Sequence, residues 1–583
     1  SLPLSLSLSL EDTLVAVPDV YIIAYIDDVH VVGPPESVRA AYDVLIPKLA
    51  AIGLHINVGK SKVYSPEGPV VEFSDIVYGE GEVQEFFPGS ILPVDGLRVL
   101  GAPVGSRDFE VDFCNRTVLE LAKAYPKLKQ LPDVQSQLLL LQFCAHPRFQ
   151  HLLRMVPPAT LQSAALQHDS LIQVHLRGLV SSAIPLPEVA VALSQLPRRW
   201  GGNGLTSAQR LSPAGYFGSW ALVWAPMTVL FPHVAELLPF LGADSVPATA
   251  AGREDLSVAR DLQWCRQTLQ RSRDEVEAFR EVHQESLLPH GASTTVSLEW
   301  SAFAQPRQKL QKEFSTISHA ADFARMYEMA PTQAVKARLL SVSERGAQAH
   351  WAAVPSFWKF VIPPGPAVAG LSLQLGIPQP SLRGVRVCAC GASIDPQGYH
   401  YLVCNRRGWT MAQHHRLRDT VAAMLRTVYD PGSVVTEPRN HREYSPRHRP
   451  DVVVRNYDGR GNFLIIDTSV VFPCAATYVS RAATRRLHAA SMHEQSKRSV
   501  YGDCGPHKLV PFAVESFGAL GPAASALLRE CAELRQDRLG PGESEATWST
   551  RSFSSYWRQR IAVGLQVDIG TGVESRALED WEH

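Results

Sequence analysis

Long apolar runs, a dense set of cysteines and an excess of charge of one sign are all missing from this sequence. No stretch approaches the ~20 consecutive apolar residues of a membrane-spanning helix, so we expect no membrane partner. Nine cysteines among 583 residues do not form the pattern of a secreted disulfide scaffold. The opening SLPLSLSLSL lacks the basic start and cleavage site of a signal peptide. It also lacks an initiating Met, so we expect that the chain begins inside a longer protein.

The net charge of −1 conceals an uneven distribution along the chain. Residues 381–510 contain 19 Lys and Arg against 10 Asp and Glu, a net of +9, so the remainder carries −10. Eight of the 20 histidines fall in the same window. A segregated basic region is typical of proteins that bind polyanions, although a basic surface can also serve solubility alone.

Hydrophobic periodicity and turn signals predict a multidomain α+β and α/β protein. Short strands and helices alternate in residues 1–105, and residues 106–231 and 232–375 are mostly helical. The Pro/Gly-rich stretch at 362–370 indicates a domain boundary. Residues 376–412 form a compact cysteine-rich knuckle, and residues 541–583 are a C-terminal tail. In residues 413–540 we expect a helix at 413–428, strands at 451–455 and 462–471, a long helix at 478–501, and a last strand and turn at 509–521.

Three cysteines and a histidine lie within seventeen residues, at Cys388, Cys390, His400 and Cys404. Four such thiolate and imidazole ligands hold Zn²⁺ in a tetrahedron, and short spacings let one turn supply two of them. The one-residue gap between the first two cysteines is shorter than usual. The alternative is a set of scattered buried cysteines with a surface histidine. We expect a zinc site, with His414 as a substitute ligand candidate.

Two aspartates sixteen positions apart adjoin apolar strands. Asp451 follows Arg449-Pro450 and leads into VVVRN, and Asp467 ends FLIID. Neighbouring strands that place one carboxylate each at the same edge form a hard-oxygen site for Mg²⁺ or Mn²⁺. Such an ion can activate water for phosphodiester hydrolysis. Glu437 is a third carboxylate candidate from the preceding element.

A lysine is expected to orient the attacking water at such a site. The position two residues after Asp467 is Ser469, so the simplest D-x-K arrangement is absent. Lys497, in a basic helical segment, would supply the amine, and Tyr501 shares its helix face. The alternative is that the first aspartate is a turn residue, the second a strand terminus, and the lysine part of a solvated helix face.

The order of these motifs resembles the restriction-like endonuclease of site-specific non-LTR retrotransposons. A CCHC knuckle, R-P-D, a second Asp ending a strand and a lysine displaced onto the next helix cover about 130 residues here. The resemblance implies a PD-(D/E)-x-K core with Asp451 and Asp467 as metal ligands and Lys497 as the catalytic lysine. Glu437 is a weaker candidate. The Cys-x-Cys spacing and Ser469 depart from the simple pattern. Nucleic-acid contacts are expected at Arg449, Arg481, Arg485 and, near the amino terminus, Lys60.

The front of the chain carries a second motif. Ala24-Tyr25-Ile26-Asp27-Asp28 lies between apolar segments at an expected hairpin and resembles the Y-x-D-D signature of reverse transcriptases, whose carboxylates hold Mg²⁺. The segments 53–62, which contains Lys60, and 97–105 resemble the next two polymerase motifs. The alternative is an ordinary acidic hairpin. Only about twenty residues precede Tyr25, which leaves no room for the earlier aspartate strand, so we expect no polymerase activity from this chain alone.

The resemblance implies a truncated retroelement protein. Its nuclease would nick double-stranded target DNA and leave a 3′-hydroxyl that primes reverse transcription of the retroelement RNA, and its location would be nuclear. The alternative is an inactive or domesticated remnant that binds nucleic acid without cleaving it. The implied regions are a partial reverse-transcriptase palm (1–105), a helical thumb (106–231), a helical linker (232–375), the zinc knuckle (376–412), the restriction-like endonuclease (413–540) and the tail (541–583).

Overall fold

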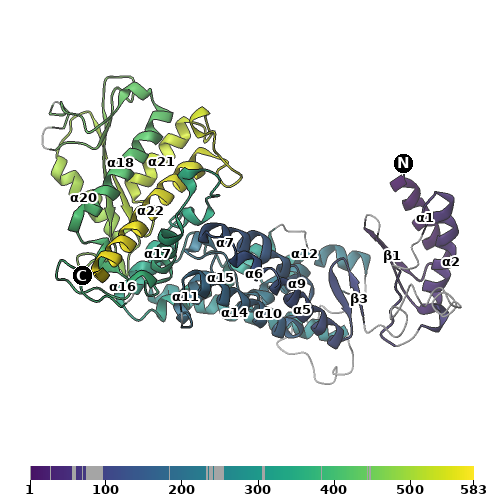
Figure 1. The fold of residues 1–583 in the computed structure, drawn as a ribbon. Coiled ribbons are helices and arrows are strands. Elements are labelled where there is room, and N and C mark those ends of the chain that lie inside the picture. The colour runs from purple at the N-terminus through teal and green to yellow at the C-terminus, as the bar shows by residue number, and fades with distance from the viewer. Residues whose placement is uncertain are drawn as a thin grey trace. The chain divides into compact units, whose positions relative to one another are not determined.

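The chain folds as a mainly helical protein with small sheets, and it divides into two compact units, residues 1–116 and 117–583 (Figure 1). None of the described helices combines the length and the apolar character needed to cross a bilayer. The computed structural model describes residues 2–25, 28–55, 61–67, 70–73, 96–182, 184–231, 234, 241, 255–304, 309–382, 384–442, 444–445 and 448–582.

Two antiparallel hairpins and two long helices form the described part of the first unit. The hairpin expected around Tyr25 is confirmed, because Tyr25 pairs with Asp28 across its end. The strand expected at 97–100 belongs to a second hairpin, whose turn at Leu100 and Gly101 has φ values of 47° and 89°. Two left-handed residues in a row are typical of tight hairpin turns. The elements are α1 (Leu2–Ala16), β1 (Tyr21–Tyr25), β2 (Asp28–Val32), α2 (Pro35–Ala51), β3 (Gly96–Val99) and β4 (Ala102–Gly105).

Residues 2–16 had no assigned element, and they form α1 in spite of their alternating Leu and Ser. The strand expected near 55–58 lies outside the described residues, except for His55, which is irregular.

The described residues between 107 and 375 are largely helical, as predicted. Phe217, Trp300 and Phe314 are the centre of one hydrophobic cluster, formed with α12, α14 and α15. A larger cluster runs from Tyr125 to Ala577, so this helical region and the carboxy-terminal region share one core. The helices are α5 (Arg107–Ala122), α6 (Tyr125–Lys129), α7 (Val134–Leu140), α8 (Pro147–Gln150), α9 (Leu152–Met155), α10 (Pro158–Leu179), α11 (Glu188–Gln195), α12 (Ala208–Leu230), α14 (Asp255–Val282), α15 (Leu310–Glu328), α16 (Gln333–Val342) and α17 (Pro364–Leu375).

The Pro/Gly-rich stretch at 362–370 is not an exposed boundary, and that prediction is wrong. Pro364 opens α17, because proline suits the first turn of a helix, where an N–H has no intrahelical partner. Ala367 and Leu371 are fully buried. The helix packs against α22 (Phe553–Glu582), so these small residues are needed for close helix packing.

A four-stranded mixed sheet organises residues 434–515. The strand order is β5 (Val434–Thr436), β6 (Val452–Val454), β7 (Leu464–Val471) and β8 (Lys508–Glu515). Neighbours among the first three strands are antiparallel, and β8 is parallel to β7. A parallel pair needs a crossover connection, which α19 (Val479–Ala482) and α20 (His488–Tyr501) supply. The predicted strands at 451–455, 462–471 and 509–521 are confirmed as β6, β7 and β8, the last of which ends at Glu515.

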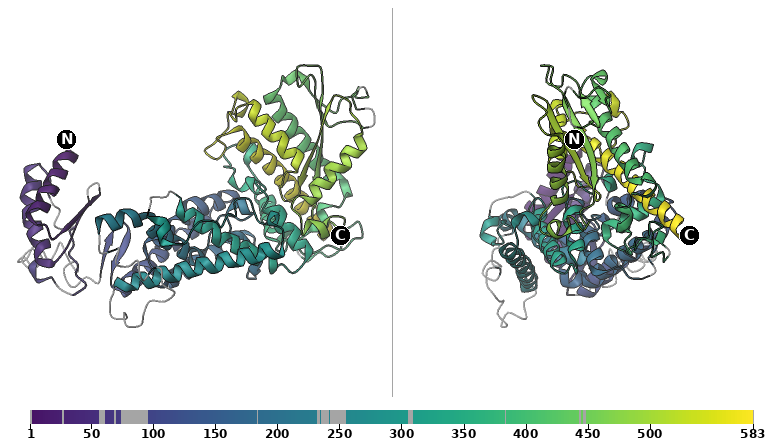
Figure 2. Two further views of the ribbon diagram at one scale, coloured as in Figure 1. Left: turned by 180° about the vertical axis from the view of Figure 1, so that it is seen from behind. Right: turned by 90° about the vertical axis from the view of Figure 1, so that its left-hand side faces the viewer.

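Both faces of the sheet are covered by helices. Side chains alternate between faces along a strand, and Val453 and Ile465 accordingly pack with Tyr501 of α20. Val454 and Ile466 belong to the main core on the opposite face, with α18 (Trp409–Val428) and α21 (Pro522–Leu534). In Figures 1 and 2 the strands run between α20 on one side and α18 with α21 on the other. The helix predicted at 413–428 is confirmed as α18.

The long helix predicted at 478–501 is instead two helices. Leu487 has a left-handed φ of 53°, which separates α19 from α20. Arg486, next to it, donates to the carbonyls of Leu287 and Leu340, which anchors the break to the helical region. The break at Leu487 sets the direction in which α20 runs along the sheet, and α20 carries Lys497 to the site.

Candidate functional site

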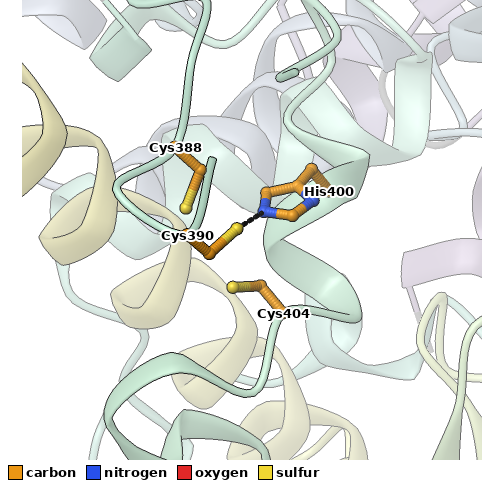
Figure 3. A group of neighbouring side chains, drawn as sticks. All are labelled: Cys388, Cys390, His400 and Cys404. Carbon is orange, nitrogen blue, oxygen red and sulfur yellow. Dashed lines mark hydrogen bonds between the residues drawn. The ribbon is translucent and has the colours of Figure 1, made fainter. Parts of the chain in front are cut away.

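The predicted zinc ligands converge at one point. The ligand atoms of Cys388, Cys390, His400 and Cys404 all lie within 4.8 Å of one another. Figure 3 shows the four side chains pointing inward, with Cys390 Sγ 3.2 Å from His400 Nε2. Sulfur and nitrogen ligands about 2.1–2.3 Å from a tetrahedral zinc ion require separations of this size. The residues therefore fit a zinc ion. His414, the substitute candidate, is elsewhere, at the acidic site described below.

The local backbone explains how four ligands meet in so short a segment. The first two cysteines lie in a hairpin-like turn, where Cys388 N donates to Ala392 O and Gly391 has a left-handed φ of 85°. On the other side, Asp395 accepts the backbone N–H of His400 at 3.1 Å and so fixes the start of the short helix that carries the histidine. Cys404 N then donates to His400 O, which brings the last sulfur back toward the turn.

The ionisation of these groups suits metal binding. Burial, together with the nearby Arg576 guanidinium, lowers the pKa of His400, so that its ring is neutral at pH 7. The backbone N–H of Ala392 lowers the pKa of Cys390, whereas burial raises that of Cys388 to about 12. A divalent cation would supply the positive charge that a buried thiolate needs.

The end of α22 closes over the knuckle. Asp580 accepts hydrogen bonds from Ala389 N at 3.1 Å and from Tyr401 Oη at 2.7 Å, and it pairs with Arg406 at 2.8 Å. Arg576 donates to Cys404 O at 3.0 Å. Residues of α22 thus bind the backbone beside the first, second and fourth ligands. Residues 541–583 were expected to be a C-terminal tail, whereas most of them form α22, whose apolar side chains belong to the main core.

A second cluster lies at the sheet, around Asp467. Its carboxylate is 3% exposed, with Oδ1 2.9 Å from Lys497 Nζ. Tyr501, one helical turn later on α20, donates its O–H to Oδ2 at 2.7 Å. Asp467 lies within β7 and does not end it, and the lysine expected from the next helix is in contact with it, although thirty residues separate the two. Burial and this carboxylate raise the pKa of Tyr501, so the phenol stays protonated and continues to donate.

Asp451 lies across from Asp467. Val452 pairs with Ile466, and continuing this antiparallel register by one residue sets the two aspartates opposite each other. Directly opposed residues have Cβ atoms about 5 Å apart on the same face of a sheet. Asp451 accepts the N–H and O–H of Thr468 at 2.6 and 2.8 Å. Both predicted acids thus come from adjoining strand positions.

His414 of α18 is the third partner of this site, and sequence reasoning assigned it elsewhere. Its Nε2 lies 3.1 Å from Asp451 Oδ1. The hydrogen bond that its ring donates to Asp451 raises the pKa of His414. Burial alone would raise the pKa of Asp451, but the hydrogen bonds from His414 and Thr468 outweigh it and lower that pKa. The carboxylate is therefore ionised at neutral pH.

Glu437, the weaker catalytic candidate, is held by two arginines. It follows β5 with a left-handed φ of 44°. Arg418 of α18 contacts Oε1, and Arg449 donates to Oε2 at 2.8 Å and to the Glu437 carbonyl at 2.7 Å. The structure brings Glu437 to the same edge of the sheet as Asp451, since Glu437 N donates to Asp451 O. Both of its carboxylate oxygens, however, are in ion pairs.

The other predicted nucleic-acid contacts divide into two groups. Arg481 and Arg485 are exposed beside α19 and α20, with no ion pair to a described residue. Arg449 is half-exposed and engaged by Glu437. Lys60 lies outside the described residues.

The polymerase motif is described only in part. Asp28 is exposed as the first residue of β2, next to the hairpin end. Asp27 lies outside the described residues. The hairpin therefore places the carboxylate of Asp28 at the surface, as expected for a residue at a turn.

Within the described ranges, the cysteine–histidine group is the one set of three or more metal-ligating side chains whose atoms converge, so the acids at the sheet form a pair and not such a group. No protein-family model matches this chain, and no curated protein matches it in sequence.

Proposed function

We propose that residues 409–534 are a metal-dependent DNA endonuclease, joined to a zinc knuckle and to part of a reverse transcriptase of the non-LTR retrotransposon kind. One observation carries the proposal: Lys497 Nζ is 2.9 Å from Asp467 Oδ1, beside Asp451 on the neighbouring strand. Two acids where β6 adjoins β7, together with an amine from α20, are a combination that phosphodiester hydrolysis uses.

The donor set fits a hard divalent ion. Two opposed carboxylates provide anionic oxygens, and Asp451 is kept ionised by its partners. A bound Mg²⁺ or Mn²⁺ would neutralise the scissile phosphate and lower the pKa of its water. The residues of the chain supply the rest. Lys497 orients the attacking water and takes Asp467 as its counter-ion, while Tyr501 fixes that carboxylate by donating to its second oxygen.

The surroundings support DNA as the substrate. The window 381–510 carries a net charge of +9, and the exposed Arg481 and Arg485 lie on the same crossover as Lys497. The zinc knuckle precedes α18 directly, and α18 bears His414. In this proposal the nick leaves a 3′-hydroxyl that primes reverse transcription of retroelement RNA. In the same proposal the location of the protein is nuclear.

A nicking assay tests the proposal. Supercoiled plasmid is incubated with the chain and Mg²⁺ or Mn²⁺, and conversion to the open circle is measured. We expect nicking that Asp467→Asn abolishes and that Asp458→Asn, an exposed acid in the β6–β7 turn, leaves unchanged. Equal nicking by both variants would show that the activity arises at another site or from a contaminant.

One set of contacts favours the alternative, an inactive remnant that binds nucleic acid. Both oxygens of Glu437 are held by arginines, and Asp467 is already neutralised by Lys497. In such a remnant the acids would be structural. It predicts DNA binding without cleavage in any divalent ion, with the Asp467→Asn variant binding as tightly as the wild type.

A further inference from the structure

A row of hydroxyl groups lies on an irregular segment between α14 and α15, far from the acids in the sequence. Between residues 291 and 299, burial alternates from one residue to the next, with Ala292, Thr294, Val296 and Leu298 inside. Thr294 Oγ1 donates to Glu277 at 3.1 Å and accepts from Arg280 at 2.9 Å, which ties the inner edge to α14. The outer edge therefore presents Ser293, Thr295 and Ser297 in succession. The hydroxyls of Ser293 and Thr295 lie 3.1 Å apart and are hydrogen-bonded to each other.

Cations face this row across a cavity of about 510 Å³. Lys309 and Lys312 come from the start of α15, and Arg199 comes from a single helical turn at Arg198–Trp200. Arg199 donates to the hydroxyl of Thr316 at 3.4 Å. None of the three cations forms an ion pair with a described residue, and Glu313 is the single carboxylate in the lining. We call this site the hydroxyl–lysine cavity.

The lining specifies the chemistry of a ligand. Three unpaired cations on fixed elements repel one another, and an anion between them offsets that repulsion. Serine and threonine hydroxyls and lysine amines are common partners of phosphate oxygens. The lining contains no aromatic side chain on which a base could stack. The cavity has the size of an ordinary ligand pocket, which admits a single strand but not a duplex.

We propose that the hydroxyl–lysine cavity binds the phosphodiester backbone of a single nucleic-acid strand, without reading its bases. The hydrogen-bonded hydroxyls of Ser293 and Thr295 would contact one phosphate group from one wall, and the lysines would neutralise that phosphate and its neighbours from the other. This site is separate from the acids at the sheet and does not depend on nuclease activity.

Fluorescence anisotropy of a labelled oligothymidylate, titrated with the full chain over a range of salt concentrations, tests the proposal. The variant Lys309→Ala/Lys312→Ala removes two phosphate contacts, so the slope of log K against log salt becomes shallower by about 1.4, or roughly 0.7 for each contact. The matched control Lys127→Ala/Lys129→Ala removes two exposed lysines of α6 that lie outside the cavity lining. We expect its slope to equal that of the wild type.

A second variant keeps the lysines and changes the opposite wall. Ser293→Asp/Thr295→Asp places two carboxylates on exposed positions, and we expect it to weaken strand binding as the lysine variant does. Unchanged thermal unfolding of both variants rules out misfolding as the cause. Equal salt slopes for the lysine variant and its control would overturn the proposal. The proposal would also be overturned if another phosphate carrier competed as well, per phosphate, as unlabelled oligothymidylate does. The carriers to compare are thymidine monophosphate, a phosphoserine peptide and phosphatidylserine vesicles.

Discussion

The contact between Lys497 and Asp467 gives the sharpest test of the acidic site, because it can be measured without any cleavage. At 2.9 Å the two charges attract by at most about 6 kcal/mol at an effective dielectric constant near 20. Lys497 is 25% exposed, so solvent and side-chain entropy reduce this figure. Removing one partner of a largely buried pair typically costs about 3 kcal/mol or more. Tyr501 still donates to the carboxylate, so the expected loss of stability lies at the lower end of this range.

Lys497→Met should therefore lower the local stability of β7 and α20 by about 3 kcal/mol, a factor of roughly 150 in the opening constant. Amide hydrogen exchange of peptides from these elements, read by mass spectrometry, measures this factor locally, which suits a chain of two units better than a global unfolding curve. Asp467→Asn and the double variant complete a thermodynamic cycle.

The control for this cycle is Arg498→Met, which removes an exposed cation from the neighbouring position of α20. It should change exchange by less than about 0.5 kcal/mol. A coupling energy between Lys497 and Asp467 within about 0.5 kcal/mol of zero would refute the reasoning. The amine would then not be at the carboxylate in solution, and the proposed water-orienting role would lose its basis.

Two further predictions concern the neighbouring contacts. Asp580→Ala should weaken zinc binding about 10- to 100-fold, because Asp580 holds the backbone at Ala389. Competition with a chromogenic chelator measures the zinc affinity, and Glu582→Gln is the control. An unchanged affinity of the Asp580→Ala variant would contradict the prediction. His414→Ala should destabilise the sheet edge by about 1 kcal/mol at pH values between about 4 and 6.5. Because the pKa of His414 is raised, its contribution to the stability of the fold is complete below the ordinary imidazole pKa and is lost as the pH rises through the raised value. Because the pKa of Asp451 is lowered, its carboxylate stays ionised, and able to accept from His414, down to acidic pH. Hydrogen exchange near pH 5.5 and near pH 9 tests this, and a pH-independent effect would rule it out.

The sequence predicts those parts of the sites that depend on short-range geometry. The four zinc candidates converge because they lie within seventeen residues, where a turn and a short helix are enough to bring them together. The positions of Asp467 and Lys497 followed from two periodicities. Strand alternation sets the face on which Asp467 lies, and helical spacing aligns Lys497 with Tyr501, so that packing one element on the other brings the three side chains together.

Contacts that depend on packing between distant elements were not predictable in this way. His414 was a zinc candidate because it lies ten residues after the last cysteine, and only the packing of α18 on the sheet brings it to Asp451 instead. Glu437 looked available for a metal ion, but its carboxylate is held by Arg418 of α18 and by Arg449, which lies just before β6. The stretch at 362–370 looked like a linker because small residues that permit close helix packing have the same composition as a flexible segment.

The position of α22 has a consequence for how the protein is made. Its residues fill core sites against α17 and α18, and Asp580 completes the hydrogen bonding of the knuckle. Domains generally fold as they emerge during synthesis, amino-terminal part first. Here the core around α17 and α18 cannot be completed, and part of its apolar surface stays exposed to solvent, until residues as late as Ala577 have been translated. Nascent chains that stall before residue 553 would therefore expose this surface and depend on chaperones to remain soluble.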